Sequence, residues 1–129
     1  MKILGIGVDV IQNKRIKLLI KNRIFLKKTF GVNEIKKSKN FLNKTNYFAK
    51  RFAAKEALAK SIGTGFRNNL NFKDIEILND NLGKPYFFKS KKICNIINKR
   101  FKIKNFEIFL SISDEKDYSV AFSVLQKLK

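Results

Sequence analysis

Two acidic residues stand where the surrounding sequence is apolar. Asp9 ends a short apolar run, and Glu56 lies in the helical segment 51–65. At roughly 100° per residue, Glu56 shares the apolar side of that helix with Phe52, and Lys60 follows one turn later. A carboxylate in such a position loses solvation unless a cation offsets the loss. Both acids therefore call for a partner of positive charge.

Two carboxylates at the ends of two regular elements suit a hard cation such as Mg²⁺, which takes one or two carboxylates and completes its octahedron with water and phosphate oxygens. Lys60 lies on the same helix face as Glu56, within reach of a phosphate oxygen. A simpler interpretation stays open for each residue. Glu56 and Lys60 have the spacing of an ordinary ion pair on a helix, worth about 0.3–0.5 kcal/mol. For Asp9, a helix cap or a turn at the end of the strand is an equally good explanation.

Two glycine-containing loops are candidates for close approach of the backbone to a phosphate, namely Gly63-Thr64-Gly65 and Gly83-Lys84-Pro85. Neither is a Walker loop, and glycine in a turn often marks only the turn. Ser113 ends the strand-like run Ser111-Ile112-Ser113, where its hydroxyl is positioned to meet a ligand. A polar residue on a half-buried strand is an equally ordinary explanation.

The composition indicates one folded domain over residues 1–129, with 44% hydrophobic and 30% charged residues. The formal net charge is +19, and the first fifty residues contain only Asp9 and Glu34 as acids. Such a charge attracts polyanions: nucleic acid, anionic membrane, nucleotide phosphates or an acidic protein. Lys, Asn, Ile and Phe make up more than half of the chain, however, so compositional bias also explains much of the excess. The charge supports a polyanionic partner without choosing one.

The chain has one cysteine and no histidine, which excludes disulfides, zinc fingers and His-based triads within it. Cys94 lies in an apolar run, and we expect a buried structural thiol there. The apolar run before Asp9 is too short for a signal sequence, and no run reaches membrane-spanning length. We therefore expect a cytoplasmic protein, or the mature form of a protein of an organelle matrix, with no membrane partner.

The hydrophobic pattern predicts an α+β domain with a mostly antiparallel sheet packed on one long helix and several shorter helices. We expect Asn46 to cap the long helix and Gly63 to end it. The other predicted elements, in chain order, are a buried strand over 2–8, two or three short helices over 12–44, a strand over 72–78, a turn over 79–85, a basic helix over 89–101, and a hairpin of strands 106–113 and 118–125.

Taken together, these segments resemble the holo-(acyl carrier protein) synthases, the small homotrimeric class of 4'-phosphopantetheinyl transferases. The matching motifs occur in family order and span nearly the whole chain. They are Gly5-Ile6-Gly7-Val8-Asp9-Val10, Arg15-Ile16, Arg51-Phe52-Ala53-Ala54-Lys55-Glu56-Ala57, Lys60, Gly63-Thr64-Gly65, Asp74-Ile75-Glu76-Ile77, Asn79-Asp80, Gly83-Lys84-Pro85 and Leu110-Ser111-Ile112-Ser113.

The resemblance implies transfer of the phosphopantetheine arm of coenzyme A to a serine of acyl carrier protein, with release of 3',5'-ADP, in fatty acid biosynthesis. It assigns Asp9 and Glu56 as Mg²⁺ ligands and Lys60 to the pyrophosphate, so that these three residues carry the catalysis. It also implies the 4'-phosphopantetheinyl transferase fold and a homotrimer with active sites at the subunit interfaces. The residues that it assigns to coenzyme A binding are Arg51, Gly63, Thr64, Gly65, Gly83, Lys84, Pro85 and Ser113. The base for the carrier serine stays open between Glu56 and a water on the metal.

The same resemblance gives the basic N-terminal region a partner, because acyl carrier proteins are acidic. Arg15 matches a family arginine that meets the acidic helix of the carrier. Lys14, Lys17 and Lys21 extend the same patch. On this interpretation, neither nucleic acid nor membrane is a partner.

Two residues depart from the family pattern. Asp114 stands where the family usually has a histidine near a coenzyme A phosphate, so either a nearby lysine takes over that contact or coenzyme A lies differently. Gln12 stands where a glutamate is frequent, which affects metal affinity more than metal identity. A basic nucleic-acid-binding domain without catalysis is the alternative function, and a family member that has lost activity is a third; the presence of Asp9, Glu56 and Lys60 opposes the latter.

Overall fold

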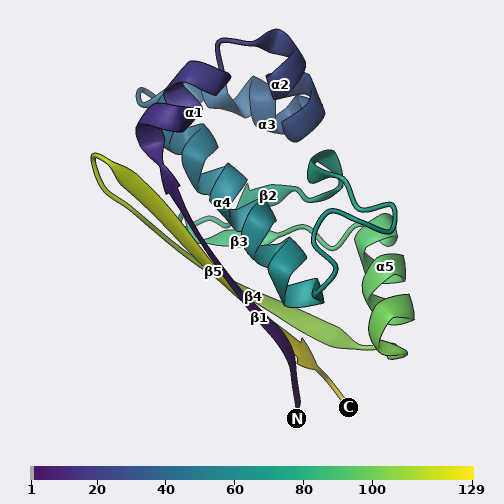
Figure 1. Cartoon of the computed structure of the whole chain (residues 1–129). Coiled ribbons are helices and arrows are strands. Elements are labelled where there is room, and N and C mark those ends of the chain that lie inside the picture. The colour runs from purple at the N-terminus through teal and green to yellow at the C-terminus, as the bar shows by residue number, and fades with distance from the viewer. Residues whose placement is uncertain (1) are drawn as a thin grey trace.

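The computed structural model describes residues 2–129 and contains a three-stranded antiparallel sheet with a long helix across one face (Figure 1). The sheet consists of β1 (Lys2–Gln12), β5 (Tyr118–Lys127) and β4 (Phe106–Asp114), in that spatial order. The helix is α4 (Lys44–Ile62). This arrangement confirms the predicted α+β class with an antiparallel sheet packed on one long helix.

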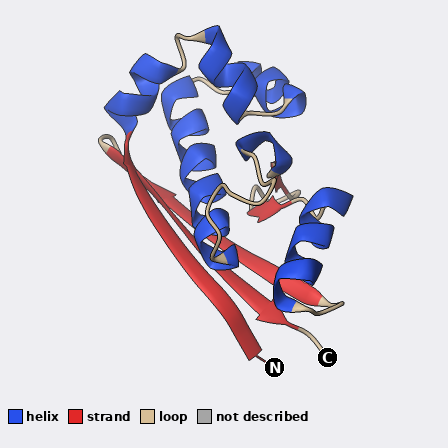
Figure 2. Cartoon of the chain, turned by 45° about the vertical axis from the view of Figure 1, so that its right-hand side comes forward, coloured by secondary structure: helices blue, strands red, loops and turns tan. Residues whose placement is uncertain are grey.

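Shorter elements surround α4. Figure 2 shows α1 to α3 gathered at the N-terminal end of α4, and α5 beside its C-terminal end. The hairpin of β2 and β3 lies behind α4 in Figure 1. The bounds of these elements are α1 (Asn13–Leu19), α2 (Arg23–Thr29), α3 (Val32–Lys37), the 3₁₀ turns η1 (Ser38–Asn40) and η2 (Phe72–Asp74), β2 (Ile77–Asn79), β3 (Pro85–Phe87) and α5 (Lys91–Phe101). In the described part of the chain, no helix is long and apolar enough to cross a membrane.

The first strand is longer than predicted. It runs to Gln12, which pairs with Tyr118, because the ladder between β1 and β5 continues along the whole of β1. Asp9 therefore lies inside a strand, opposite Ala121, and the prediction that it ends the strand was wrong. Its side chain is on the inner face, since alternate residues of a strand share a face and Gly7 and Ile11 are buried.

The predicted N-cap of α4 was also wrong. Asn43 occupies that position, and its Oδ1 accepts a hydrogen bond from the backbone N–H of Asn46 at 3.0 Å. The side chain of Asn46 instead donates to Asp114 Oδ2 at 2.8 Å. Gly63 ends the helix as predicted, with a φ of 90°, a left-handed conformation that glycine adopts without steric cost.

Most of the strand predicted over 72–78 does not form, because a buried ion pair holds this segment in another conformation. Lys55 and Glu34 are almost completely buried, and Lys55 Nζ lies 2.7 Å from Glu34 Oε1. The same ammonium donates to the carbonyls of Phe72 and Ile75. Because a side chain occupies these carbonyls, the backbone forms η2, and ladder pairing begins only at Ile77.

The sheet packs on α4 through two glycines of β1. A Cβ built on Gly5 would lie 1.9 Å from the carbonyl oxygen of Ser61, and a Cβ on Gly7 would lie 1.9 Å from that of Ala57. No side chain fits between the two backbones at these positions. The glycines therefore bring β1 directly against α4, and this close approach sets the distance between Asp9 and the acidic side chain of α4.

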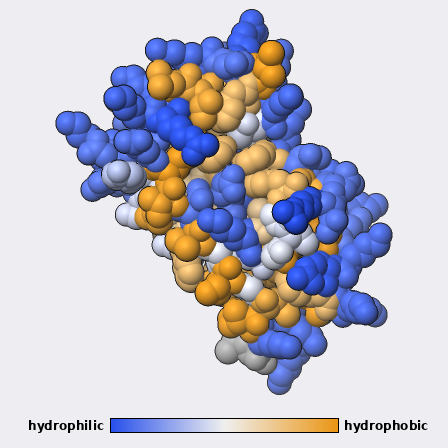
Figure 3. Space-filling model, viewed as in Figure 1, coloured by the Kyte–Doolittle hydropathy of each residue, from blue (hydrophilic) through white to orange (hydrophobic). Residues whose placement is uncertain are grey.

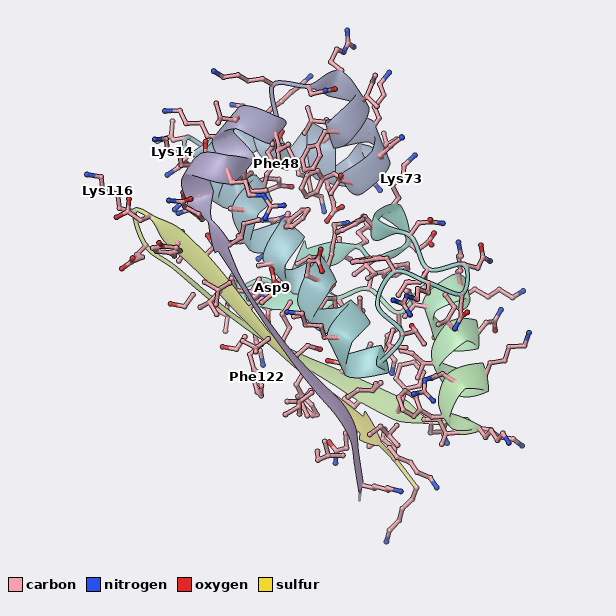
Figure 4. All side chains as sticks on the ribbon, in the orientation of Figure 1. Asp9, Lys14, Phe48, Lys73, Lys116 and Phe122 are labelled. Carbon is pink, nitrogen blue, oxygen red and sulfur yellow. The ribbon has the colours of Figure 1, made fainter. Side chains whose placement is uncertain are left out.

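The outer face of the sheet is apolar and exposed. Figure 3 shows hydrophobic residues over β1 at the lower left of the molecule, and Figure 4 shows Phe122 pointing away from the helices. The large apolar side chains that alternation places on this face are Ile6, Val8, Val10, Phe109 and Phe122, which are between 43% and 61% exposed. The core lies on the other face, beneath α4. Cys94, predicted to be buried, is only partly buried.

Candidate active site

Asp9 and Glu56 come together where β1 crosses α4. Figure 4 shows Asp9 beside the helix. Lys60 Nζ lies 3.3 Å from Asp9 Oδ1 and donates to the carbonyl of Val8 at 2.8 Å. Lys60 therefore pairs with Asp9 across the two elements, and the ordinary Glu56–Lys60 pair is not among the ion pairs of residues 2–129.

Both carboxyls are harder to ionise than usual. Burial raises the pKa of Asp9 above its ordinary value, and the hydrogen bond and charge of Lys60 oppose this rise. Burial also raises the pKa of Glu56, and the negative charge of Asp9 raises it further. Lys60 and Arg15 lower both pKa values in part. The two acids are thus close enough to repel each other, and a cation between them would relieve that repulsion.

This pair fits a hard divalent cation. Carboxylate oxygens are the ligands that Mg²⁺ takes from proteins, usually one or two of them. Within residues 2–129, the Glu56 carboxylate accepts no hydrogen bond, so its oxygens are free to coordinate. The described residues contain no cluster of three or more acidic, histidine or cysteine side chains.

The basic residues on and just after α1 lie at two different sites, the acidic pair and a separate groove. Arg15 acts on the pKa values of Asp9 and Glu56, so it faces the acidic pair. The lysines Lys14, Lys17 and Lys21 line a groove of about 560 Å³ on the other side of the helix. Figure 4 shows Lys14 near Lys116, which lines the same groove from the tip of the β4–β5 hairpin. The four predicted partner-binding residues therefore divide between the acidic pair and a basic groove.

Hydrogen bonds of Asn13 join the two walls of this groove, which are α1 and the β4–β5 hairpin. Its backbone N–H donates to the carbonyl of Asp117 at 2.8 Å, and its side-chain amide donates to the carbonyls of Glu115 and Lys116 at 2.8 and 3.1 Å. The hydroxyl of Ser119 donates to Asn13 Oδ1 at 2.7 Å. The start of α1 is therefore held against the hairpin, which fixes the two walls of the groove relative to each other.

Arg51 lines a second, smaller pocket on the opposite side of α4. The pocket has a volume of about 200 Å³, and its lining is Lys50, Arg51, Ile77, Asn79, Gly83, Pro85, Ile112 and Asp114. Arg51 and Glu56 are five residues apart, so their side chains project about 140° apart around the helix. Two of the three residues in the predicted loop Gly83-Lys84-Pro85 thus line the same pocket as Arg51, and Lys84, between them, is exposed.

The Arg51 guanidinium is held rigidly. It lies 3.6 Å from the centre of the Tyr47 ring, its Nη1 donates to the Tyr47 carbonyl at 3.2 Å, and its Nη2 donates to Asn79 Oδ1 at 2.9 Å. Its Nε is buried and has no hydrogen-bond partner among residues 2–129. Burial lowers the pKa of Arg51, although a guanidinium remains charged at any physiological pH. Only two of its five N–H donors make hydrogen bonds among residues 2–129, so the guanidinium is a candidate for binding an anion.

The remaining predicted residues lie outside both pockets. Gly63, Thr64 and Gly65 form the loop at the end of α4, directly after the turn that carries Lys60, and the Gly65 N–H donates to the Ala59 carbonyl at 3.3 Å. Ser113 is exposed on the outer face of the sheet, because its neighbours Ile112 and Asp114 both face the pocket.

Two residues that line the Arg51 pocket, Lys50 and Asn79, and one residue beside its rim, Asn46, were not predicted as site residues from the sequence. Lys50 was not distinguished from the many other lysines of the chain, although it directly precedes the predicted site residue Arg51. Asn79 was assigned to a turn, and its partnership with Arg51 depends on the packing of β2 against α4. Asn46 was assigned to a helix cap, so its contact with Asp114 was missed.

Comparison with known proteins agrees with this geometry. The family model of the 4'-phosphopantetheinyl transferase superfamily matches residues 5–123. The holo-[acyl-carrier-protein] synthase of Pelagibacter ubique is 59% identical over 127 residues, covering 98% of this chain and 99% of that protein. This chain therefore belongs to the 4'-phosphopantetheinyl transferase superfamily.

Solved structures show the same fold. The holo-[acyl-carrier-protein] synthase of Neisseria meningitidis superposes with a TM-score of 0.88 at 39% identity, covering 98% of this chain and all of that one. A holo-(acyl-carrier-protein) synthase of Bacillus anthracis in complex with CoA (3',5'-ADP) superposes with a TM-score of 0.81 at 34% identity, covering 98% of both chains. The predicted family and fold are confirmed.

Proposed function

We propose that this chain is a holo-[acyl-carrier-protein] synthase, which moves the 4'-phosphopantetheine of coenzyme A to a serine of apo acyl carrier protein and releases 3',5'-ADP. The observation that carries the proposal is the pair of mutually repelling carboxylates, Asp9 and Glu56. Gly5 and Gly7 allow the close packing of β1 on α4 that brings them together, and Lys60 forms an ion pair with Asp9. The names of the relatives supply the reaction. They do not favour the alternative of a nucleic-acid-binding domain.

Asp9 and Glu56 would hold Mg²⁺. When bound, the metal would neutralise charge on the pyrophosphate of coenzyme A. Lys60 adds a positive charge beside it, and its hydrogen bond to the Val8 carbonyl directs the ammonium toward the acidic pair. Arg15 adds another. Charge that develops on the leaving phosphate thus meets cations already in position, which lowers the barrier without reorganisation during the reaction.

The Arg51 pocket is suited to a second phosphate of the same donor. Coenzyme A carries a phosphate on its ribose in addition to the pyrophosphate. Contacts with Tyr47 and Asn79 already fix the Arg51 side chain without a ligand. Little side-chain conformational entropy would therefore be lost when a phosphate binds to it. The turn residues Gly83 and Pro85 line the same pocket and would contact the nucleotide. We assign Lys84 and the loop Gly63-Thr64-Gly65 to the edges of the donor site.

We infer a homotrimer with active sites at the subunit interfaces. The acidic pair is on the β1 edge of the sheet, whereas the Arg51 pocket is on the β4 edge, with α4 between them. An interface would let the two halves from different subunits face one donor. The exposed apolar outer face of the sheet supplies a surface that association would bury. Ser113, on that face, would then meet a neighbouring subunit.

The basic groove at α1 fits an acidic carrier protein. Lys14, Lys17 and Lys21 give it a positive field, and Arg15 connects that surface to the acidic pair. Complementary charge speeds association and fixes the orientation of the partner. We propose a cytoplasmic enzyme of fatty acid biosynthesis, with residues 1–129 acting as one domain.

The test is the intact mass of an apo acyl carrier protein after incubation with the enzyme, coenzyme A and Mg²⁺. We expect a gain of one phosphopantetheine, abolished by EDTA. Glu56→Gln keeps the shape of the side chain but removes its charge, and should reduce the rate by about 10²–10³-fold. Glu115→Gln, on the exposed hairpin, is the matched control and should keep the rate. No mass gain with several carriers would refute the proposed function.

A further inference from the structure

The Arg51 pocket has a mixed charge. Lys50 and Arg51 contribute two cations to its lining, and Asp114 contributes one anion. A phosphate monoester carries about −1.5 to −2 charges near neutral pH. An acid at the edge of the pocket repels such a group, so phosphate binding depends on which cations remain available.

Asp114 is committed to a neighbour outside the lining. The side-chain amide of Asn46 donates to Asp114 Oδ2 at 2.8 Å and to the carbonyl of Glu115 at 3.1 Å. Within residues 2–129, Asp114 forms no ion pair with Lys50 or Arg51. Asn46 therefore holds the acid at the rim, where it does not neutralise either cation by direct contact.

Arg51 is held in place by its neighbours. Each of its two terminal nitrogens makes one hydrogen bond, to the Tyr47 carbonyl and to Asn79, and its buried Nε has no partner among residues 2–129. Lys50 is different: it is half-buried at the pocket and makes no hydrogen bond or ion pair through its ammonium among residues 2–129. An ammonium has three donors and can follow a phosphate on a flexible stem.

We propose that Lys50 is the second phosphate-binding cation of this pocket and that it contacts the ribose 3'-phosphate of coenzyme A together with Arg51. The proposal rests on the proposed function, since that function supplies the ligand. Lys50 also determines the sign of the net charge of the pocket lining. With it, the lining has two positive charges and one negative; without it, Arg51 and Asp114 cancel.

The test compares coenzyme A with dephospho-coenzyme A, which lacks only the 3'-phosphate. Binding of each to the whole protein is measured by titration calorimetry with Mg²⁺ and without a carrier. Lys50→Met keeps the stem and removes the charge. Since hydrogen bonds to charged groups contribute more than neutral ones, we expect about tenfold weaker binding of coenzyme A and unchanged binding of dephospho-coenzyme A. Lys50→Arg should recover most of the loss.

Lys44→Met is the matched control, because Lys44 is an exposed lysine at the start of the same helix and does not line the pocket. It should leave both affinities unchanged. Unchanged dephospho-coenzyme A binding also shows that Lys50→Met remains folded.

Three results would overturn the assignment: an equal loss for both ligands, no loss for either, or a native protein that does not prefer coenzyme A over its dephospho form. Failure of the proposed function is seen separately, as the absence of a mass gain on the carrier. The two failures are therefore distinguishable.

Discussion

The two sides of α4 present opposite electrostatic problems. On the side of β1, Glu56 and Asp9 repel each other, and burial raises the pKa of both. On the side of β2 and β3, Arg51 is stacked on Tyr47 and hydrogen-bonded through two of its five N–H donors. On the acidic side, Lys60 and Arg15 offset the two acids only in part, and on the basic side two cations line the pocket with one acid. On the function proposed above, a metal-bound pyrophosphate and a separate phosphate of coenzyme A would complement the two sides.

The comparison also separates how the two sides are built. The acidic side depends on backbone contact between β1 and α4 through Gly5 and Gly7. The basic side depends on side chains, above all on the buried Lys55–Glu34 pair that ties η2 and β2 to α4. Substitutions can therefore damage one side at a time.

The largest effect is expected from Lys55→Met. Glu34 would remain buried and unpaired, and the carbonyls of Phe72 and Ile75 would lose their donor. Removing one partner of a buried pair costs about 3–5 kcal/mol. Thermal or urea unfolding should show that loss. Replacing both residues, as Lys55→Met with Glu34→Leu, should cost less than Lys55→Met alone, and a larger cost would contradict a role for the unpaired charge.

Gly7→Ala should damage the acidic side next. The new Cβ would lie 1.9 Å from the carbonyl oxygen of Ala57, so β1 and α4 must separate. Overpacking of this kind costs about 1–3 kcal/mol, and the added distance should weaken Mg²⁺ binding as well. Gly31→Ala is the control, because its Cβ would meet only a Glu34 oxygen at 3.9 Å. If unfolding shows equal stability for the two variants, close packing at Gly7 does not position the site.

Asp114→His should have the smallest effect, on the basic side. The change removes an exposed negative charge from the rim of the Arg51 pocket. Because exposed charges are screened by solvent, we expect the KM for coenzyme A to fall by no more than a few-fold or to stay unchanged. A clear rise in KM, measured at saturating carrier, would show that Asp114 itself serves the donor.

The sequence predicted the elements well where local patterns determine them. Alternation indicated the β4–β5 hairpin, and Gly63 marked the end of α4. It failed where distant contacts decide the outcome. Lys55 takes the carbonyls that a strand over 72–78 would have used, and no local pattern shows that a lysine will be buried.

The site was predicted in the same uneven way. Asp9 and Glu56 were found because acids in apolar surroundings need a partner, and the structure brings them together. The positions of Lys50 and Asn79 in the Arg51 pocket were not predicted, because they depend on which face of α4 meets the β2–β3 turn. The effect of Arg15 on the acidic pair likewise depends on the tertiary position of α1.

The most direct test of the acidic pair as a metal site is the rise in Tm caused by Mg²⁺ as a function of pH. Because the pKa values of Asp9 and Glu56 are raised, the free fold binds their protons more tightly than the unfolded chain does, and stability from these groups falls as pH rises through the raised values. Mg²⁺ should reverse that loss. We predict a clear Tm increase near neutral pH that shrinks as the pH falls toward the ordinary glutamate value of 4.5, and that Glu56→Gln abolishes. An increase that is independent of pH, or that survives in Glu56→Gln, would contradict metal binding at these two carboxylates.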